Sequence, residues 1–239
     1  MGRIFEKRKN RMFARWAKMS KAFTKIGREI AIAVRAGGPN PDSNSRLRSA
    51  IQNARTANMP KDRVDAAINK AASKDASVMD EVFYEAYGPH GVAIFVETAT
   101  DNPTRTVGNV RNFITRRGGN LATKGALDFV FNRKGVFTIS KPDQDIEEFE
   151  LELIDYGLED LFETEEGDLL LYADFSSFGE MHHFLEAKKV EIKQSGSQRV
   201  PLSYVELGEA EKKVVLDLIE VLEEDDDVQN VYHNLKLEE

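Results

Sequence analysis

The first third of the chain shows apolar residues at helical spacing, in three segments separated by turn signals. The spacing predicts a helix over 23–36. A Gly-Gly-Pro sequence ends this helix, Asn44 or Ser45 is placed to cap a second one, and Pro60 marks the start of a third. Three short amphipathic helices over about 22–80 predict a small helical bundle.

The middle and the end of the chain combine strand and helix patterns. An unbroken apolar run predicts a buried strand over 92–98. Beyond it we predict, in chain order, a helix with its apolar face at Val107, Val110 and Ile114, a hairpin of 127–131 and 136–139 with a basic turn at 132–135, a helix over 209–222 and a closing strand over 228–235. The order β-α-β-β-α-β is typical of a ferredoxin-like layer.

The segment 141–205 interrupts this layer and has helix and strand patterns of its own. The predicted class is therefore α+β, with an N-terminal three-helix bundle followed by a ferredoxin-like α/β domain that is interrupted by an inserted α/β domain. The predicted divisions are a basic arm at 1–21, the bundle at 22–80, the ferredoxin-like domain at 81–140 plus 206–239, and the inserted acidic domain at 141–205.

The net charge of −8 hides a strong asymmetry along the chain. Residues 1–80 carry a net charge of +11, residues 81–135 a net +2 and residues 136–239 a net −21. This pattern favours a polyanion-binding front and a solvated acidic back, although an acidic surface also serves solubility alone. The chain has no Cys, which excludes disulfides and thiolate metal sites. We find no apolar run near membrane-spanning length and no secretory signal, and we expect a cytoplasmic protein.

Cations and aromatic residues alternate in the predicted arm, which favours contact with nucleic acid. The alternative is an amphipathic helix whose Phe5, Phe13 and Trp16 dock on the body. The expected contacts in the arm and the bundle are Arg3, Lys7, Arg8, Lys9, Arg11, Arg15, Trp16, Lys18, Lys21, Lys25, Arg28, Arg46 and Arg48.

A polar stripe on the helix after the buried strand adds further expected contacts. Its members are Arg105, Asn109, Asn112 and Arg116, and Arg133 and Lys134 of the predicted basic turn complete the set. Arg contacts phosphates and Asn hydrogen-bonds sugars or bases. The alternatives are a solvent-facing helix side and a contact between domains. An acidic run at 223–227, or the acidic insertion, is expected to compete with nucleic acid for the basic arm.

Catalysis and metal binding find no support in the motifs. We find no phosphate-binding loop, zinc-protease helix or nucleophile elbow, and expect neither an enzyme nor a cofactor. Glu180, His183 and Glu186 share one helix face, which we interpret as solvated. Glu97 is the exception, because a carboxylate on a buried strand is placed to face a domain cleft and to pair with Arg105.

Several ordered motifs resemble the YebC family of regulatory proteins. They are FTKIGREI at 23–30, GGPNPDSNSRLR at 37–48, NMPKD at 58–62, YEAYGPHGVAIFVET at 84–98, TDNPTRT at 100–106 and FNRKG at 131–135. His90 stands where the family usually has Gly, and the N-terminal arm differs from the usual opening. The resemblance implies a three-domain layout and a regulator of gene expression.

Two functions follow from the resemblance and the charge pattern together. YebC-like proteins are described as probable transcriptional regulators that bind DNA, whereas close relatives, including mitochondrial ones, act as translational activators associated with the ribosome. We therefore expect a non-enzymatic nucleic-acid-binding regulator, with a ribosome-associated translational activator that binds ribosomal RNA as the alternative. The residues do not decide between DNA and the ribosome as the partner.

Overall fold

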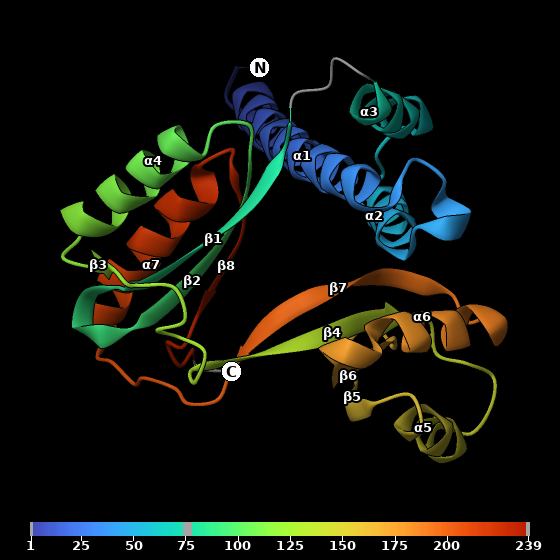
Figure 1. The fold of residues 1–239 in the computed structure, drawn as a ribbon. Helices are drawn as coiled ribbons and strands as arrows, with labels where there is room; N and C mark the ends of the chain where they lie inside the picture. Colours follow the sequence, from blue (N-terminus) through green and yellow to red (C-terminus); the bar gives the residue numbers. More distant parts are fainter. Residues whose placement is uncertain (1, 74–77, 238–239) are drawn as a thin grey trace.

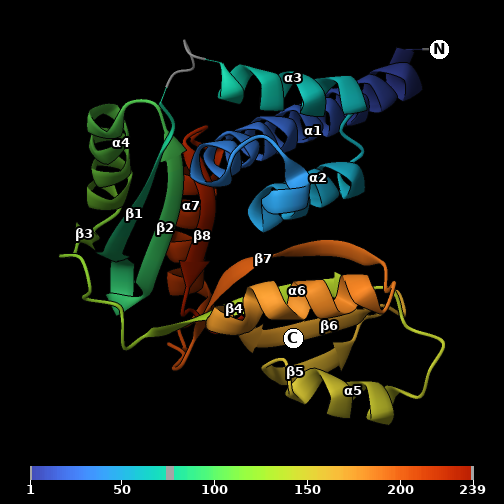
Figure 2. The same ribbon diagram turned by 45° about the vertical axis from the view of Figure 1, so that its right-hand side comes forward.

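The computed structural model describes residues 2–73 and 78–237, with the backbone alone for residues 2–18. Its helical N-terminal region, followed by two separate four-stranded sheets, confirms the α+β class (Figures 1 and 2). The N-terminal helices are α1 (Gly2–Gly37), α2 (Ser45–Thr56) and α3 (Lys61–Ala72). Helix α1 is unbroken, so its backbone does not change where we predicted the arm to meet the bundle.

The three N-terminal helices pack around a small apolar core. Ile30 of α1, Leu47 of α2 and Val64 of α3 meet there, as their helical spacing predicts. Asn44 caps α2, because its side-chain oxygen accepts a hydrogen bond from the backbone N–H of Leu47 at 3.0 Å.

The first sheet has the strand order β3-β1-β2-β8. Its elements are β1 (Asp80–Tyr87), β2 (Ala93–Thr100), α4 (Pro103–Arg116), β3 (Asn120–Leu121), α7 (Glu209–Glu224) and β8 (Val228–His233). Helices α4 and α7 lie side by side on one face of the sheet (Figure 1). Apolar residues of both helices and of β2 form the core between them.

The second sheet is antiparallel throughout, with the order β5-β6-β4-β7. Its elements are β4 (Phe131–Ile139), α5 (Ile146–Ile154), β5 (Leu158–Glu163), β6 (Leu169–Asp174), α6 (Phe178–Ala187) and β7 (Ile192–Pro201). Phe137 and Phe149 are fully buried in its core.

Two strand predictions are wrong. Residues 124–130 form turns and 131–139 form one continuous strand, so the predicted hairpin around 132–135 does not exist. That strand belongs to the second sheet, which therefore begins at Phe131 and not near residue 141. We also missed β1, so the first sheet has the order β-β-α-β-α-β along the chain in place of the predicted β-α-β-β-α-β.

Gly119 is required by close packing between α4 and β1. A Cβ atom there would lie 2.7 Å from the carbonyl oxygen of Tyr87 and 2.8 Å from a side-chain carbon of Ile114. We expect Gly119→Ala to lower the free energy of unfolding by about 1–3 kcal/mol, measured by urea denaturation, because the backbone must shift. Gly108→Ala is the control. It adds a Cβ in open space within α4, so we expect about 1 kcal/mol of added stability. A stable Gly119→Ala protein would contradict this packing argument.

Candidate nucleic-acid interface

Asp227 is a buried carboxylate between α1, α4 and the start of β8. Its side chain is 4% exposed and accepts hydrogen bonds from Arg28 at 2.6 Å, Arg105 at 2.8 Å and Thr106 at 2.7 Å. Burial opposes the charged carboxylate, but the hydrogen bonds from Arg105, Arg28 and Thr106 outweigh it and lower the pKa of Asp227 to about 2. Arg28 and Arg105, both expected nucleic-acid contacts, thus join α1 to the first sheet and its helices.

The other expected contacts on the bundle also lie against neighbouring elements. Lys25 donates to a backbone carbonyl of β8 at 3.1 Å, and Arg46 pairs with Glu81 of β1 at 2.6 Å. Arg48 donates to carbonyl oxygens of the turn before α2. Lys21 is half-buried on α1. Most of these cations are therefore engaged within the protein.

The polar stripe of α4 divides into a paired half and a free half. Near the start of the helix, Asn109 donates to Asp225 at 3.0 Å, beside the Arg105 contact already described. Further along, Asn112 and Arg116 are exposed and form no hydrogen bond or ion pair with any described residue. Arg111 and Arg117 extend this free region, which we call the α4 cationic end (Arg111, Arg116 and Arg117). Figure 1 shows it beside β3, away from the N-terminus of α1.

The side chains of residues 2–18 lie outside the described part of the structure. This concerns the expected contacts Arg3, Lys7, Arg8, Lys9, Arg11, Arg15, Trp16 and Lys18. Only the helical backbone of α1 is described there.

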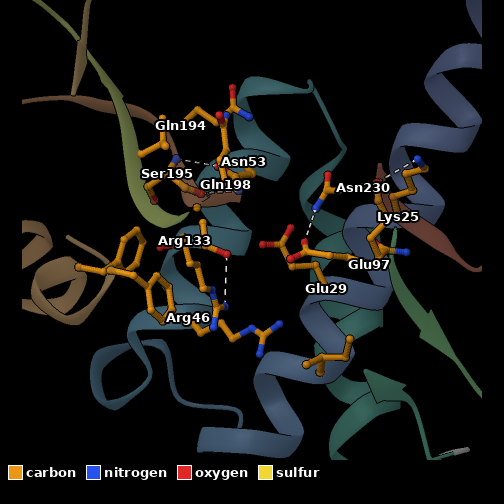
Figure 3. A pocket seen from close by; sticks show the side chains of 18 of the residues that line it. Lys25, Glu29, Arg46, Asn53, Glu97, Arg133, Gln194, Ser195, Gln198 and Asn230 are labelled. Atoms are coloured by element: carbon orange, nitrogen blue, oxygen red, sulfur yellow. Dashed lines mark hydrogen bonds between the residues drawn. The ribbon is translucent and has the colours of Figure 1, made fainter. Parts of the chain in front are cut away.

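A cavity of about 560 Å³ lies where the bundle and the two sheets meet. Glu29 of α1 and Glu97 of β2 lie next to each other on one side of it, with Arg46 and Arg133 across from them (Figure 3). Arg133 lies within β4, near its start, and its guanidinium carbon is 3.6 Å from the centroid of the Phe175 ring. Its neighbour on that strand, Lys134, forms an ion pair with Glu159.

Glu97 faces this cavity, but its partners differ from the expected one. It accepts a hydrogen bond from Asn230 at 3.1 Å and lies 3.6 Å from Arg199, whereas Arg105 is bound to Asp227. Burial raises the pKa of Glu97, opposed by Asn230 and Arg199. Burial likewise raises the pKa of Glu29, opposed by Arg46 and by a hydrogen bond from Asn53. The cavity therefore holds two carboxylates that take up protons more readily than exposed ones.

The residues that the structure describes include neither a cluster of metal-binding side chains nor a helix suited to crossing a membrane. Glu180, His183 and Glu186 are exposed, as interpreted from their spacing. No group of three or more His, Asp or Glu side chains gathers among the described residues in a way that could hold a metal ion. None of the described helices combines the length and apolar character needed to cross a membrane.

Family models for the TACO1/YebC proteins match nearly the whole chain. The model of the TACO1/YebC N-terminal domain matches residues 3–74, and that of the second and third domain matches residues 79–235. The chain belongs to the TACO1/YebC family.

Individual relatives agree with this membership. A probable transcriptional regulatory protein from Flavobacterium johnsoniae is 51% identical, over 100% of this chain and 100% of its own. A protein of the same name from Myxococcus xanthus is also 51% identical, over 98% of this chain and 100% of its own. The crystal structure of a conserved hypothetical protein from Aquifex aeolicus has a TM-score of 0.80 at 38% identity, covering 93% of this chain and 92% of that chain.

In this TACO1/YebC chain, sequence reasoning missed the roles of Asp227 and Glu29. Asp227 belongs to the acidic run that we expected to compete with nucleic acid, and only the folded chain places it against α1 and α4. Glu29 occupies a polar position of a basic helix, and nothing in the spacing indicates that it faces a cavity. Competition between the acidic run and nucleic acid stays a prediction.

Proposed function

We propose that the protein is a non-enzymatic, cytoplasmic regulator of gene expression that binds nucleic acid. The relatives named probable transcriptional regulatory proteins support a regulatory role. The α4 cationic end carries the binding part of the proposal, because Arg111 and Arg116 are exposed without partners among the described residues. Unpaired guanidinium groups on one helix end are available to phosphates.

The packing of α2 favours contacts with the nucleic-acid backbone over reading of bases in a groove. Asn53 of α2 exchanges two hydrogen bonds with the backbone of Ser195 in β7, and Thr56 also donates to β7. The middle helix of the bundle is therefore covered by the second sheet and is not free to enter a major groove. Affinity is then dominated by charge, with little preference for sequence.

The α4 cationic end gives a direct test of this proposal. We expect the triple variant Arg111→Gln, Arg116→Gln, Arg117→Gln to bind a 20-base-pair DNA duplex or a 20-nucleotide RNA less tightly. The slope of log K against log salt should also become shallower, by up to about 0.9 per lost contact for duplex DNA and about 0.7 for single strands. Fluorescence anisotropy over a salt series measures both quantities.

The matched control removes three cations from another part of the surface. Lys141, Lys188 and Lys236 have exposed side chains and pair with exposed carboxylates, and Lys188 also lies 5.5 Å from the centroid of the Phe184 ring. Replacing these three lysines by Gln changes the net charge by the same amount as the α4 triple variant. We expect this control to keep the salt slope of the unaltered protein. Equal slopes for all three proteins would refute a role for the α4 cationic end.

The alternative is a ribosome-associated translational activator that binds ribosomal RNA. The covered face of α2 supports it, because such a protein needs only a local contact with folded RNA and no sequence-reading helix. Sedimentation of cell lysate through a sucrose gradient separates the two functions. Co-migration with ribosomes after nuclease trimming of messenger RNA supports the alternative, and protein that stays at the top of the gradient supports DNA binding.

A further inference from the structure

The cavity between the bundle and the two sheets contains polar groups that lack partners. Ser49 and Ser195 line it and are 3% and 2% exposed, yet neither hydroxyl has a hydrogen-bond partner among the described residues. The side-chain nitrogen of Gln229, also in the lining, is unpaired as well. Buried polar atoms are rarely left unpaired in folded proteins, so these atoms leave the wall of the cavity with unused hydrogen-bonding capacity.

The charges of the lining are balanced. Three carboxylates, of Glu29, Glu81 and Glu97, are matched by three cations, of Lys25, Arg46 and Arg133. Such a lining attracts neither a simple polyanion nor a simple cation. It suits a ligand that presents hydrogen-bond donors at one end and a negative charge at the other.

The carboxylates and cations differ in how much of their binding capacity remains. Glu97 is held by Asn230 and Arg199, whereas the neighbouring Glu29 accepts a hydrogen bond from Asn53 and forms no ion pair among the described residues. Across the cavity, Arg133 donates only to a serine hydroxyl, at 3.3 Å. Glu29 and Arg133 are therefore the two groups best placed to receive a ligand.

The size of the cavity and its aromatic groups narrow the ligand class. Its volume of about 560 Å³ lies within the range of roughly 300–1,000 Å³ that is typical of small-molecule pockets. This volume is larger than a single amino acid needs. Phe175 and Phe178 lie in the lining. Arg133 covers one face of the Phe175 ring and Phe178 stacks on Phe137, so the remaining surface of these rings is what an unpaired base can stack on. A nucleotide combines a base with N–H donors, a flat ring and a phosphate.

We propose that this cavity binds a single unpaired guanine nucleotide, with Glu29 accepting from the base and Arg133 contacting the phosphate. Guanine presents two adjacent N–H donors on its Watson–Crick edge, which match the two oxygens of one carboxylate, whereas adenine, cytosine and uracil do not. The proposal rests on the proposed nucleic-acid binding and names the base that one site selects. The nucleotide is either free or part of a strand.

Equilibrium dialysis of the full chain against labelled GMP, AMP, CMP and UMP tests the base preference. We expect GMP to bind about tenfold or more tightly than the other three, the discrimination typical of one two-point contact to a base. Glu29→Gln should remove most of this preference, and Glu148→Gln, at an exposed position of α5, should leave it unchanged. Equal binding of the four nucleotides would overturn the proposal. It would also be overturned if no nucleotide binds at millimolar concentration and if the short RNAs described below show no preference for guanine.

Arg133→Gln provides a second variant at an exposed position, in case Glu29→Gln does not fold. We expect it to weaken binding of GMP about tenfold and to leave guanosine, which has no phosphate, unaffected. If GMP and guanosine are weakened equally, the phosphate assignment is wrong.

Two five-nucleotide RNAs, UUGUU and UUAUU, distinguish the sources of the nucleotide. Tighter binding of UUGUU than of GMP points to a strand, and equal binding points to the free nucleotide. If guanine preference is absent while the α4 triple variant still changes the salt slope, the cavity proposal fails and the proposed function stands. If the protein prefers guanine but shows no salt-dependent binding of long nucleic acid, the cavity proposal is supported and the proposed nucleic-acid-binding function is refuted.

Discussion

Replacing Asp227 with alanine is expected to lower the free energy of unfolding by about 3–5 kcal/mol, since the substitution leaves the partners of a buried ion pair without their counter-charge. The larger part of this loss comes from Arg28, whose side chain is 18% exposed and stays buried without a counter-charge. Arg105 contributes less, because its side chain is nearly half exposed and can be hydrated by water. Thr100 and Thr106 lose an acceptor at the same time. Urea denaturation followed by circular dichroism measures the change.

Asp226→Ala is the matched control for this substitution. Asp226 is the preceding residue, carries the same charge and is exposed. We expect its replacement to change stability by less than about 0.5 kcal/mol. Similar losses for the two variants would mean that net charge, and not the buried contacts of Asp227, determines the result.

The stability difference between Asp227→Asn and the unaltered protein should depend on pH. The pKa of Asp227 falls from an ordinary 3.8 to about 2 in the folded protein, so the folded state holds the proton less tightly than the unfolded chain. The stabilisation that the ionised Asp227 carboxylate gives the unaltered protein is therefore fully present above about pH 4 and is lost as the pH falls toward 2. Urea denaturation of both proteins at pH 5 and at pH 2.5 measures it. A difference that stays constant over this range would contradict the assignment.

Glu85→Ala is expected to cost about 3 kcal/mol of stability, because two charge-assisted hydrogen bonds are lost from a buried site. Glu85 lies on β1 with 7% of its surface exposed. One carboxylate oxygen accepts from the backbone N–H of Gly125 and the other from that of Leu127, each at 2.7 Å. These contacts fix the segment 122–130, which leads from the first sheet to the second.

The loss should have a local signature as well as a global one. Hydrogen exchange at the amides of Gly125 and Leu127 is expected to rise in Glu85→Ala more than exchange in the core of the second sheet. Lys124→Ala, at an exposed position of the same segment, is the control and should leave both amides protected. Unchanged protection in Glu85→Ala would show that Glu85 does not hold this segment.

Helices were predictable from the sequence because their apolar faces repeat every three or four residues. The predicted helix over 209–222 corresponds to α7, and the predicted start at Pro60 corresponds to α3. β1 was missed because Glu85 is buried and Phe83 is 40% exposed, the reverse of what their polarity predicts. A charged residue that satisfies backbone N–H groups cannot be distinguished from a solvated one by pattern alone.

The candidate site was only partly predictable for a similar reason. The spacing placed Arg105, Asn109, Asn112 and Arg116 on one side of a helix, and the structure agrees. Which of them remain free depends on Asp225 and Asp227, which follow more than a hundred residues later. Local periodicity carries no information about such a distant partner, so the paired and the free half of the stripe look alike in the sequence.

The position of β8 in the first sheet sets an order of events during synthesis. β8 pairs with β2 near the end of the chain, as in the contact between Val228 and Thr98, whereas every strand of the second sheet lies between residues 131 and 201. The second sheet is thus complete while the hydrogen-bonding edge of β2 still awaits its neighbour. A nascent chain that pauses before residue 228 exposes this strand edge, which makes it a substrate for chaperones and a point of risk for aggregation.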